Sequence, residues 1–254
     1  MSLLQGLVSY WKLEESSGTR VDKRGTVNLT ANNTPGNAAG PTNLGNAAAF
    51  VRASSQDLSA TSPVCDSVAG TAASFTVGGW VYYTAVPQPG QVYGIINKAS
   101  GMFGAASVEY SFELAGEAGG STWTYRARMS DGVTAIRTLS NTIGMPSTST
   151  WYNFFFGWDA VAGTIFLSID NAADLILSAE GSHNGSKTLY IGSRINAHFH
   201  NGRIDGVGFW NRKLRDTERT RFYNGGRGLE YPFGFRQRRP LRGLGRGISR
   251  GLAA

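Results

Sequence analysis

Apolar side chains recur at every second position in several stretches of this chain, and this period constrains the fold more than any other feature. In residues 107–114 four apolar side chains alternate with serine and glutamate, and in residues 122–129 four alternate with threonine and arginine. A β-strand turns successive side chains to opposite faces of a sheet. The pattern therefore predicts strands with one apolar and one polar face.

The segment between these two stretches, residues 115–120, contains three glycines and is typical of a hairpin connection. An antiparallel register across it is expected to place Glu109 opposite Arg126 or Arg128 on the polar face. Such a cross-strand ion pair contributes only about 0.2–1 kcal/mol, but it would favour the pairing of the two strands.

Other segments extend the same pattern and favour a single all-β domain. Only one helix is expected, at residues 216–223, because Asp216 and Glu218 fall in its first turn and Asn224-Gly225-Gly226 follows as a stop signal. Many short strands with 34 glycines predict an all-β fold, a two-sheet antiparallel sandwich or jelly roll with one short C-terminal helix and an extended basic tail. Further strands are expected at residues 151–158, 164–169, 174–177, 188–191 and 203–210.

The positive charge of the chain is concentrated at its C-terminal end. The net charge is +7, and residues 234–254 carry six arginines and no acid, which leaves 18 basic against 17 acidic residues in residues 1–233. A nearly neutral domain does not suit a nucleic-acid-binding face. We expect an N-terminal arm (1–5), a sandwich domain (6–233) and an assembly or anchoring tail (234–254). The tail arginines are Arg236, Arg238, Arg239, Arg242, Arg246 and Arg250.

Several segments stand out in chain order: GLVSYWKLEESSGT (6–19), ASFTVGGWV (73–81), WYNF through GTIFLSID (151–170), LYIGS (189–193), FHNGRIDGV (199–207) and NRKL (211–214) with Glu218. In this order they resemble laminin-G-like, concanavalin-A-like jelly-roll domains of the kind found on bacteriophage virion proteins. The resemblance covers about residues 6–233. It departs from the family pattern at Gly206, where an acidic residue is common, and at Arg215, which replaces the usual Ser or Thr helix cap.

The resemblance implies a structural calcium ion with oxygen ligands from an early loop and from the last strand. Asp22 and Asn28 occupy that loop together with Gly25, and Asp205 stands in the last strand. Calcium takes six to eight oxygen ligands, many of them backbone carbonyls. The alternative interpretation of Asp22 and Asn28 is ordinary turn chemistry.

Sugar-binding sites use aromatic faces, and four aromatic residues lie in or beside the loop-rich stretch 86–104. These ligand-binding candidates are Tyr82, Tyr83, Tyr93 and Phe103, with packing in the core as the alternative. His198 and His200 are expected on one side of a strand, in contact with a ligand or a neighbouring subunit; a metal would need a third ligand. The tryptophans at 80, 123, 151, 158 and 210 are predicted to belong to the core.

The sequence gives no catalytic constellation. Glu109 and Glu113 are four strand residues apart, about 13 Å, whereas the carboxyl pairs of glycosidases are about 5–9.5 Å apart. The single Cys65 cannot form an intramolecular disulfide and is expected to be a small core residue. We therefore expect no catalytic residues and no enzyme.

These observations predict a non-catalytic surface protein of a virus or phage particle, a decoration, minor capsid or fibre protein. Its lectin-like domain would bind cell-surface glycans, while its tail contacts neighbouring subunits; nucleic acid or anionic lipid are alternative partners of the tail. No signal-peptide pattern and no run of about 20 apolar residues occurs, so synthesis in a host cytoplasm and location in the virion are expected. The alternatives are an extracellular bacterial carbohydrate-binding or adhesion module and, third, a glycoside hydrolase.

Overall fold

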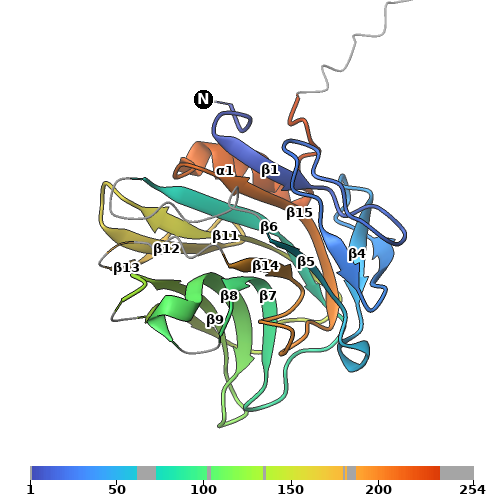
Figure 1. The fold of residues 1–254 in the computed structure, drawn as a ribbon, viewed down its shortest axis with the longest axis horizontal. Helices are drawn as coiled ribbons and strands as arrows, with labels where there is room; N and C mark the ends of the chain where they lie inside the picture. The colour runs from blue at the N-terminus through green and yellow to red at the C-terminus, as the bar shows by residue number, and fades with distance from the viewer. Residues whose placement is uncertain are drawn as a thin grey trace, which may run out of the picture.

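The computed structural model describes residues 2–61, 73–101, 104–133, 136–179, 181 and 187–234. Two β-sheets pack face to face, and one short helix lies on the outer side of one of them (Figure 1). Some of the residues singled out above lie outside the described ranges. They are Cys65, Phe103 and the tail arginines Arg236, Arg238, Arg239, Arg242, Arg246 and Arg250.

The larger sheet has eight strands, all paired antiparallel. It runs in the order β13–β12–β11–β6–β15–β4–β3, and β1 pairs with β15 outside this path. Its strands are β1 (Leu7–Trp11), β3 (Gly36–Ala39), β4 (Asn46–Phe50), β6 (Phe75–Tyr83), β11 (Trp151–Asp159), β12 (Thr164–Ile169), β13 (Leu175–Ser178) and β15 (Gly202–Trp210).

The second sheet has seven antiparallel strands in the order β10–β9–β8–β7–β14–β5–β2. They are β2 (Thr30–Asn32), β5 (Asp57–Thr61), β7 (Val92–Ala99), β8 (Val108–Gly116), β9 (Trp123–Ser130), β10 (Ile136–Ile143) and β14 (Thr188–Ile191). The helical elements are α1 (Asp216–Tyr223) and the 3-10 turns η1 (Arg52–Ser54), η3 (Ala105–Ser107) and η4 (Asn224–Gly226).

The predicted fold class is confirmed: two antiparallel sheets and one short C-terminal helix. Helix α1 and strands β12 and β14 have the predicted bounds. Helix α1 begins without a Ser or Thr cap. Instead the Glu218 carboxylate accepts a hydrogen bond from the backbone N–H of Arg215 (3.1 Å). It also forms a bidentate ion pair with Arg212 (2.7 Å for each oxygen).

The predicted pairing of Glu109 with Arg126 or Arg128 is wrong. Strand β8 continues to Gly116, so Arg126 lies opposite Glu113 and Arg128 opposite Ser111. The strands use residues that the glycine-rich pattern assigned to the loop, and the true turn is shorter, with the N–H of Glu117 donating to the carbonyl of Thr122 (3.0 Å). Alternation fixes which face a side chain occupies, but it does not fix the register of the pair.

The central strands of the eight-stranded sheet, β6, β11 and β15, are buried on both faces over most of their length. Phe154 and Phe156 face the seven-stranded sheet in a large inner core, while Phe155 faces the opposite way into a second core. Trp80 belongs to the second core and its neighbour Val81 to the inner one. Two-sided burial explains why these strands are continuously apolar instead of alternating with polar residues.

The second core closes the outer face of the eight-stranded sheet. Phe222 of α1 contacts the rings of Phe155 and Trp210 with centroids 5.3 and 6.1 Å apart. The N-terminal arm takes part, because Leu3 is 1% exposed and its carbonyl accepts the indole N–H of Trp210 (2.7 Å). Phe233 packs there as well, so both ends of the described chain meet on this face.

We expect Phe222→Ala to lower the free energy of unfolding by about 3–5 kcal/mol, because it opens a cavity between α1 and the sheet. Urea denaturation followed by tryptophan fluorescence measures the change. Thr217→Ala, on the exposed side of the same helix, is the control and should stay within about 0.5 kcal/mol of the wild type. Equal stability of the two variants would contradict the described packing of α1.

Candidate functional site

The loop between β14 and β15, residues 192–201, lies directly on the outer face of the seven-stranded sheet. The N–H of Gly94 in β7 donates to the carbonyl of His198 (2.8 Å). A Cβ atom at Gly94 would overlap the backbone of Ser193 and Arg194. Only glycine permits this approach, so the sequence of β7 determines where the loop sits.

The loop contains a tight hairpin with an unusual backbone. Arg194 and Ala197 exchange backbone hydrogen bonds of 2.8 and 3.0 Å, and the two residues between them, Ile195 and Asn196, have φ values of 54° and 52°. A left-handed conformation is strained for a β-branched residue such as isoleucine. His198 also has positive φ, at 48°. Strain of this kind is concentrated at functional sites, and here it sets the directions of Arg194 and His198.

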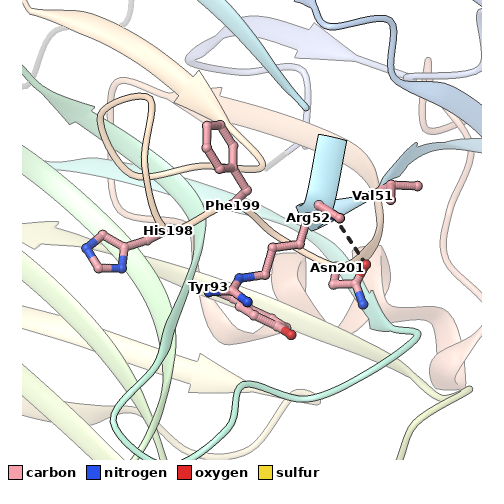
Figure 2. Close-up of a pocket in the computed structure, with 7 residues that line it drawn as sticks. Val51, Arg52, Tyr93, His198, Phe199 and Asn201 are labelled. Atoms are coloured by element: carbon pink, nitrogen blue, oxygen red, sulfur yellow. Dashed lines mark hydrogen bonds between the residues drawn. The ribbon is translucent and has the colours of Figure 1, made fainter. Parts of the chain in front are cut away.

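A pocket of ≈ 480 Å³ opens beside this loop, at the end of the sandwich where β15 begins. Its volume falls within the range of small-ligand sites, roughly 300–1,000 Å³. Figure 2 shows the lining side chains coming from three segments of the chain. They are Val51, Arg52 and Ala53 from the β4–β5 connection, Tyr93 from β7, and His198, Phe199 and Asn201 from the β14–β15 loop.

Asn201 joins these segments. Its side-chain oxygen accepts the backbone N–H of Arg52 (3.3 Å), and its carbonyl accepts the N–H of Thr84 (3.1 Å). The Arg52 guanidinium lies over the Tyr93 ring, 5.7 Å from its centroid, while the His198 imidazole points away from both (Figure 2). The pocket thus combines an aromatic floor with a charged donor.

Two of the predicted ligand-binding residues, Tyr93 and His198, line the pocket. Tyr93 is only 3% exposed, and its hydroxyl donates to the carbonyl of Val86 (3.4 Å). Burial raises the pKa of Tyr93, so the residue is a neutral ring at physiological pH. Three further lining residues, Arg52, Phe199 and Asn201, were not predicted as ligand-binding residues, although Phe199 and Asn201 lie in a segment that carries the family resemblance.

The structure places Tyr83 and His200 in the interior, so neither can contact a ligand as predicted. Both are fully buried, and the His200 ring packs against Tyr83 and Tyr93 with centroids 5.4 and 5.9 Å apart. The expectation that His198 and His200 lie on one side of a strand is wrong as well. They precede β15, in a loop whose positive φ at His198 breaks the alternation.

Tyr82 faces outward, but on the other sheet. Adjacent strand residues point to opposite faces, and Tyr82 therefore lies on the outer side of the eight-stranded sheet. Its ring contacts Trp151, with centroids 5.3 Å apart, and the Arg203 guanidinium, 4.5 Å from its centroid. Tyr82 does not line the pocket, and Trp151, expected in the core, is only half-buried.

The two carboxylates considered for catalysis have structural partners. Glu113 is 1% exposed, and its oxygens lie 3.0 Å from Arg128 and 2.8 Å from Arg194. Glu109 accepts the backbone N–H of Lys187 (2.9 Å). Neither residue lines the pocket.

The predicted calcium ligands lie in two different environments. The Asp22 carboxylate accepts four backbone N–H groups, those of Tyr10, Arg24, Gly25 and Val27 at 2.9–3.2 Å. Asn28 accepts the N–H of Asp22 (3.0 Å). This is the turn chemistry given above as the alternative, and these two side chains do not suit a cation.

Asp205 is separate from that loop, at the hydroxyl end of the Tyr10 side chain. It is fully buried, its pKa is raised by burial, and its Oδ2 atom has no hydrogen-bond partner among the described residues. Burial together with the charges of Asp205, Glu14 and Glu230 raises the pKa of the Tyr10 hydroxyl. Within the described ranges no three His, Cys, Asp or Glu side chains form a group able to hold a metal ion. Calcium binding at Asp205 stays a prediction.

The two-sheet fold and its end pocket are typical of lectin-like jelly rolls, and the sequence carries the corresponding family signature. Residues 53–218 match the family described as the Concanavalin A-like lectin/glucanases superfamily (Laminin_G_3). The chain belongs to that superfamily. A comparison with curated proteins gives no match.

Solved structures with the same fold include domain 4 of AbnA, an extracellular arabinanase from Geobacillus stearothermophilus, in complex with arabinotriose. It is 14% identical with a TM-score of 0.57, over 84% of this chain and 96% of that one. The binding domain of botulinum neurotoxin DC in complex with rat synaptotagmin II (10%, TM-score 0.62, 88% of this chain) and that of Paraclostridial Mosquitocidal Protein 1 (12%, 0.63, 87%) are also similar. The chain spans about half, 52%, of each toxin domain.

In the described part of the chain, no helix combines the length and the apolar character needed to span a membrane.

His200 predicts a pH dependence of stability. Burial lowers its pKa to about 4, against about 6.5 in the unfolded chain. The unfolded state therefore binds an extra proton between these values, and stability present above pH 6.5 is lost as the pH falls towards 4. The expected loss is about 3 kcal/mol.

Urea denaturation at pH 7, 5.5 and 4 tests this expectation by comparing the wild type with His200→Gln. The variant removes the titrating ring, so its stability should fall less between pH 7 and 4, whatever its absolute value. An equally steep fall in both proteins would show that His200 is not the group responsible.

Proposed function

We propose that this chain is a non-catalytic carbohydrate-binding protein that takes a sugar in the pocket at Tyr93. The observation that carries the proposal is the convergence of aromatic surface and hydrogen-bonding groups in one pocket of suitable volume. Phe199 is half-buried beside it, while Asn201 and Arg52 supply polar groups. Such a mixture of apolar lining and few, well-placed polar groups is typical of ligand sites.

The comparisons support a sugar as the ligand class. The arabinanase domain matches this chain over almost its whole length and was solved with arabinotriose. The toxin domains match over half of theirs and are described as binding domains. The partners of Glu109 and Glu113 support a role without catalysis, because both carboxylates serve the packing of loops on the sheet.

We expect the full-length protein to bind at least one oligosaccharide on a glycan array, and Phe199→Ala to weaken that binding about tenfold by removing a ring contact. Isothermal titration with the array hit measures the change. Val161→Ala, at a 97% exposed position in the β11–β12 turn, is the control and should bind like the wild type. Absence of glycan binding, or unchanged affinity of Phe199→Ala, would argue against this pocket.

We further propose that the protein is displayed on a virus or phage particle and attached through its arginine-rich tail. The segregation of charge supports this: six arginines in residues 234–254 follow a domain with a net charge of +1. Arginine forks bind carboxylates and carbonyls of neighbouring subunits well. The alternative remains an exported bacterial carbohydrate-binding or adhesion module.

Sedimentation of the full-length protein and of a form lacking residues 234–254 tests the attachment. The full-length protein should assemble, and the shortened form should be a monomer with an unchanged circular dichroism spectrum. Because charged contacts are screened by salt, 0.5 M NaCl should weaken the assembly. Two monomers would show that the tail does not mediate self-assembly, and an unfolded shortened form would show that it belongs to the fold.

A further inference from the structure

The charge around the pocket is positive, and Arg52 carries the most accessible part of it. Its side chain is exposed, and the guanidinium rests over the Tyr93 ring. Among the described residues, no carboxylate lies within ion-pair distance of it. Its backbone is held by Asn201. Arg52 is thus a positioned cation at a pocket, without an anion of its own.

Three more arginines, Arg126, Arg128 and Arg194, surround Glu113, which pairs with Gly94 directly after Tyr93, and we call this group the arginine row. Gly94 pairs with Glu113 and Glu113 with Arg126. The loop that lines the pocket reaches this row through Arg194, which contacts Glu113 at 2.8 Å. The pocket and the arginine row therefore adjoin one another through the contact at Gly94.

The negative charge of the carboxylates in contact with this arginine row is smaller than the positive charge of its arginines. Glu113 contacts Arg128 (3.0 Å) and Arg194 (2.8 Å), with Arg126 further away (3.9 Å), and Glu117 contacts Arg126 (2.7 Å). These contacts bring three guanidinium groups together with two carboxylates, and Arg52 adds a fourth guanidinium at the neighbouring pocket. A group of like charges beside a partly enclosed pocket raises the local concentration of anions.

His198, which lies between the pocket and the row, responds to this field. Its pKa is lowered, first by burial and then by Arg194, with Arg52 and Arg128 adding to the effect and Glu113 opposing it. Arg52 at the pocket and Arg128 in the arginine row thus both lower the pKa of the His198 imidazole. In the free protein the His198 ring is neutral at pH 7.

We propose that the pocket selects glycans that carry an anionic substituent, a carboxylate or a sulfate, and that the Arg52 guanidinium receives it. The proposal rests on the sugar-binding function proposed above and adds the chemical class of the sugar. Guanidinium presents two parallel N–H groups that match the oxygens of a carboxylate or sulfate. The Tyr93 ring beneath it orients the fork, so little side-chain freedom is lost on binding.

The experiment compares acidic and neutral members of matched pairs: sialyllactose with lactose, and oligogalacturonate with its methyl ester. Surface plasmon resonance on the immobilised full-length protein at 50 mM NaCl should show at least one acidic member binding about tenfold more tightly than its neutral partner. Arg52→Gln should reduce this ratio to near one, because only the acidic member loses the contact with the guanidinium fork while any loss of a neutral polar contact affects both members alike. Arg52→Lys, which keeps the charge without the fork, should retain part of the preference.

Two control variants separate the pocket from other sources of positive charge. Arg227→Gln removes an exposed arginine whose backbone donates to Asn224 and accepts from Asn43, and this variant should keep the full preference. Replacing the six tail arginines with glutamine should also keep it. A preference that survives in Arg52→Gln but disappears with the tail arginines would overturn the proposal.

The outcomes also distinguish this inference from the proposed function. Equal binding of both members of each pair, abolished by Phe199→Ala, would leave sugar binding in place and refute the anionic selectivity. Absence of binding to every glycan would refute both. Acidic preference lost only in Arg52→Gln supports both.

Discussion

Burial of the central strands of the eight-stranded sheet on both faces is the constraint on which the rest of the structure depends. Adjacent residues such as Phe154 and Phe155 enter different cores, so the sheet holds the seven-stranded sheet on one side and α1 with both chain ends on the other. Each large buried side chain contributes about 1.5–3 kcal/mol through its removal from water. A sheet covered in this way keeps little surface for a ligand. Recognition is left to the loops at the ends of the sandwich and to the outer face of the seven-stranded sheet, where the pocket and the arginine row occur.

The pocket and the arginine row adjoin one another because Gly94 has no side chain. It lets the β14–β15 loop rest on β7, and the loop then carries His198 and Phe199 to the pocket and Arg194 to Glu113. The left-handed backbone of Ile195 and Asn196 costs energy, which the backbone hydrogen bonds and the buried ion pair offset. The ion pair holds Arg194 at Glu113, and a group held in this way loses less freedom when a ligand binds.

Local patterns predicted the fold well, because strand alternation and the stop signal after Tyr223 are properties of neighbouring residues. The site could be predicted only in part. Arg52 and Asn201 are 149 positions apart and meet because β4 pairs with β15, a long-range fact that no local pattern contains. Tyr82 and Tyr83 looked equivalent, yet a strand can turn only one of two neighbours outward. Asp22 suits a calcium loop and an ordinary turn equally well as sequence, and only its four amide contacts distinguish them.

The pocket and the C-terminal end of the described chain lie at opposite ends of the same strand. Asn201 precedes β15, whereas Phe233 packs against Tyr10, which pairs with Gly208 near the far end of β15; the seven residue steps from Asn201 to Gly208 span roughly 23 Å. A domain held through residues beyond Gly234 would therefore project its pocket away from the point of attachment. Copies fixed side by side in this orientation could engage one branched or repeating glycan together, and weak single contacts would add up to firm adhesion.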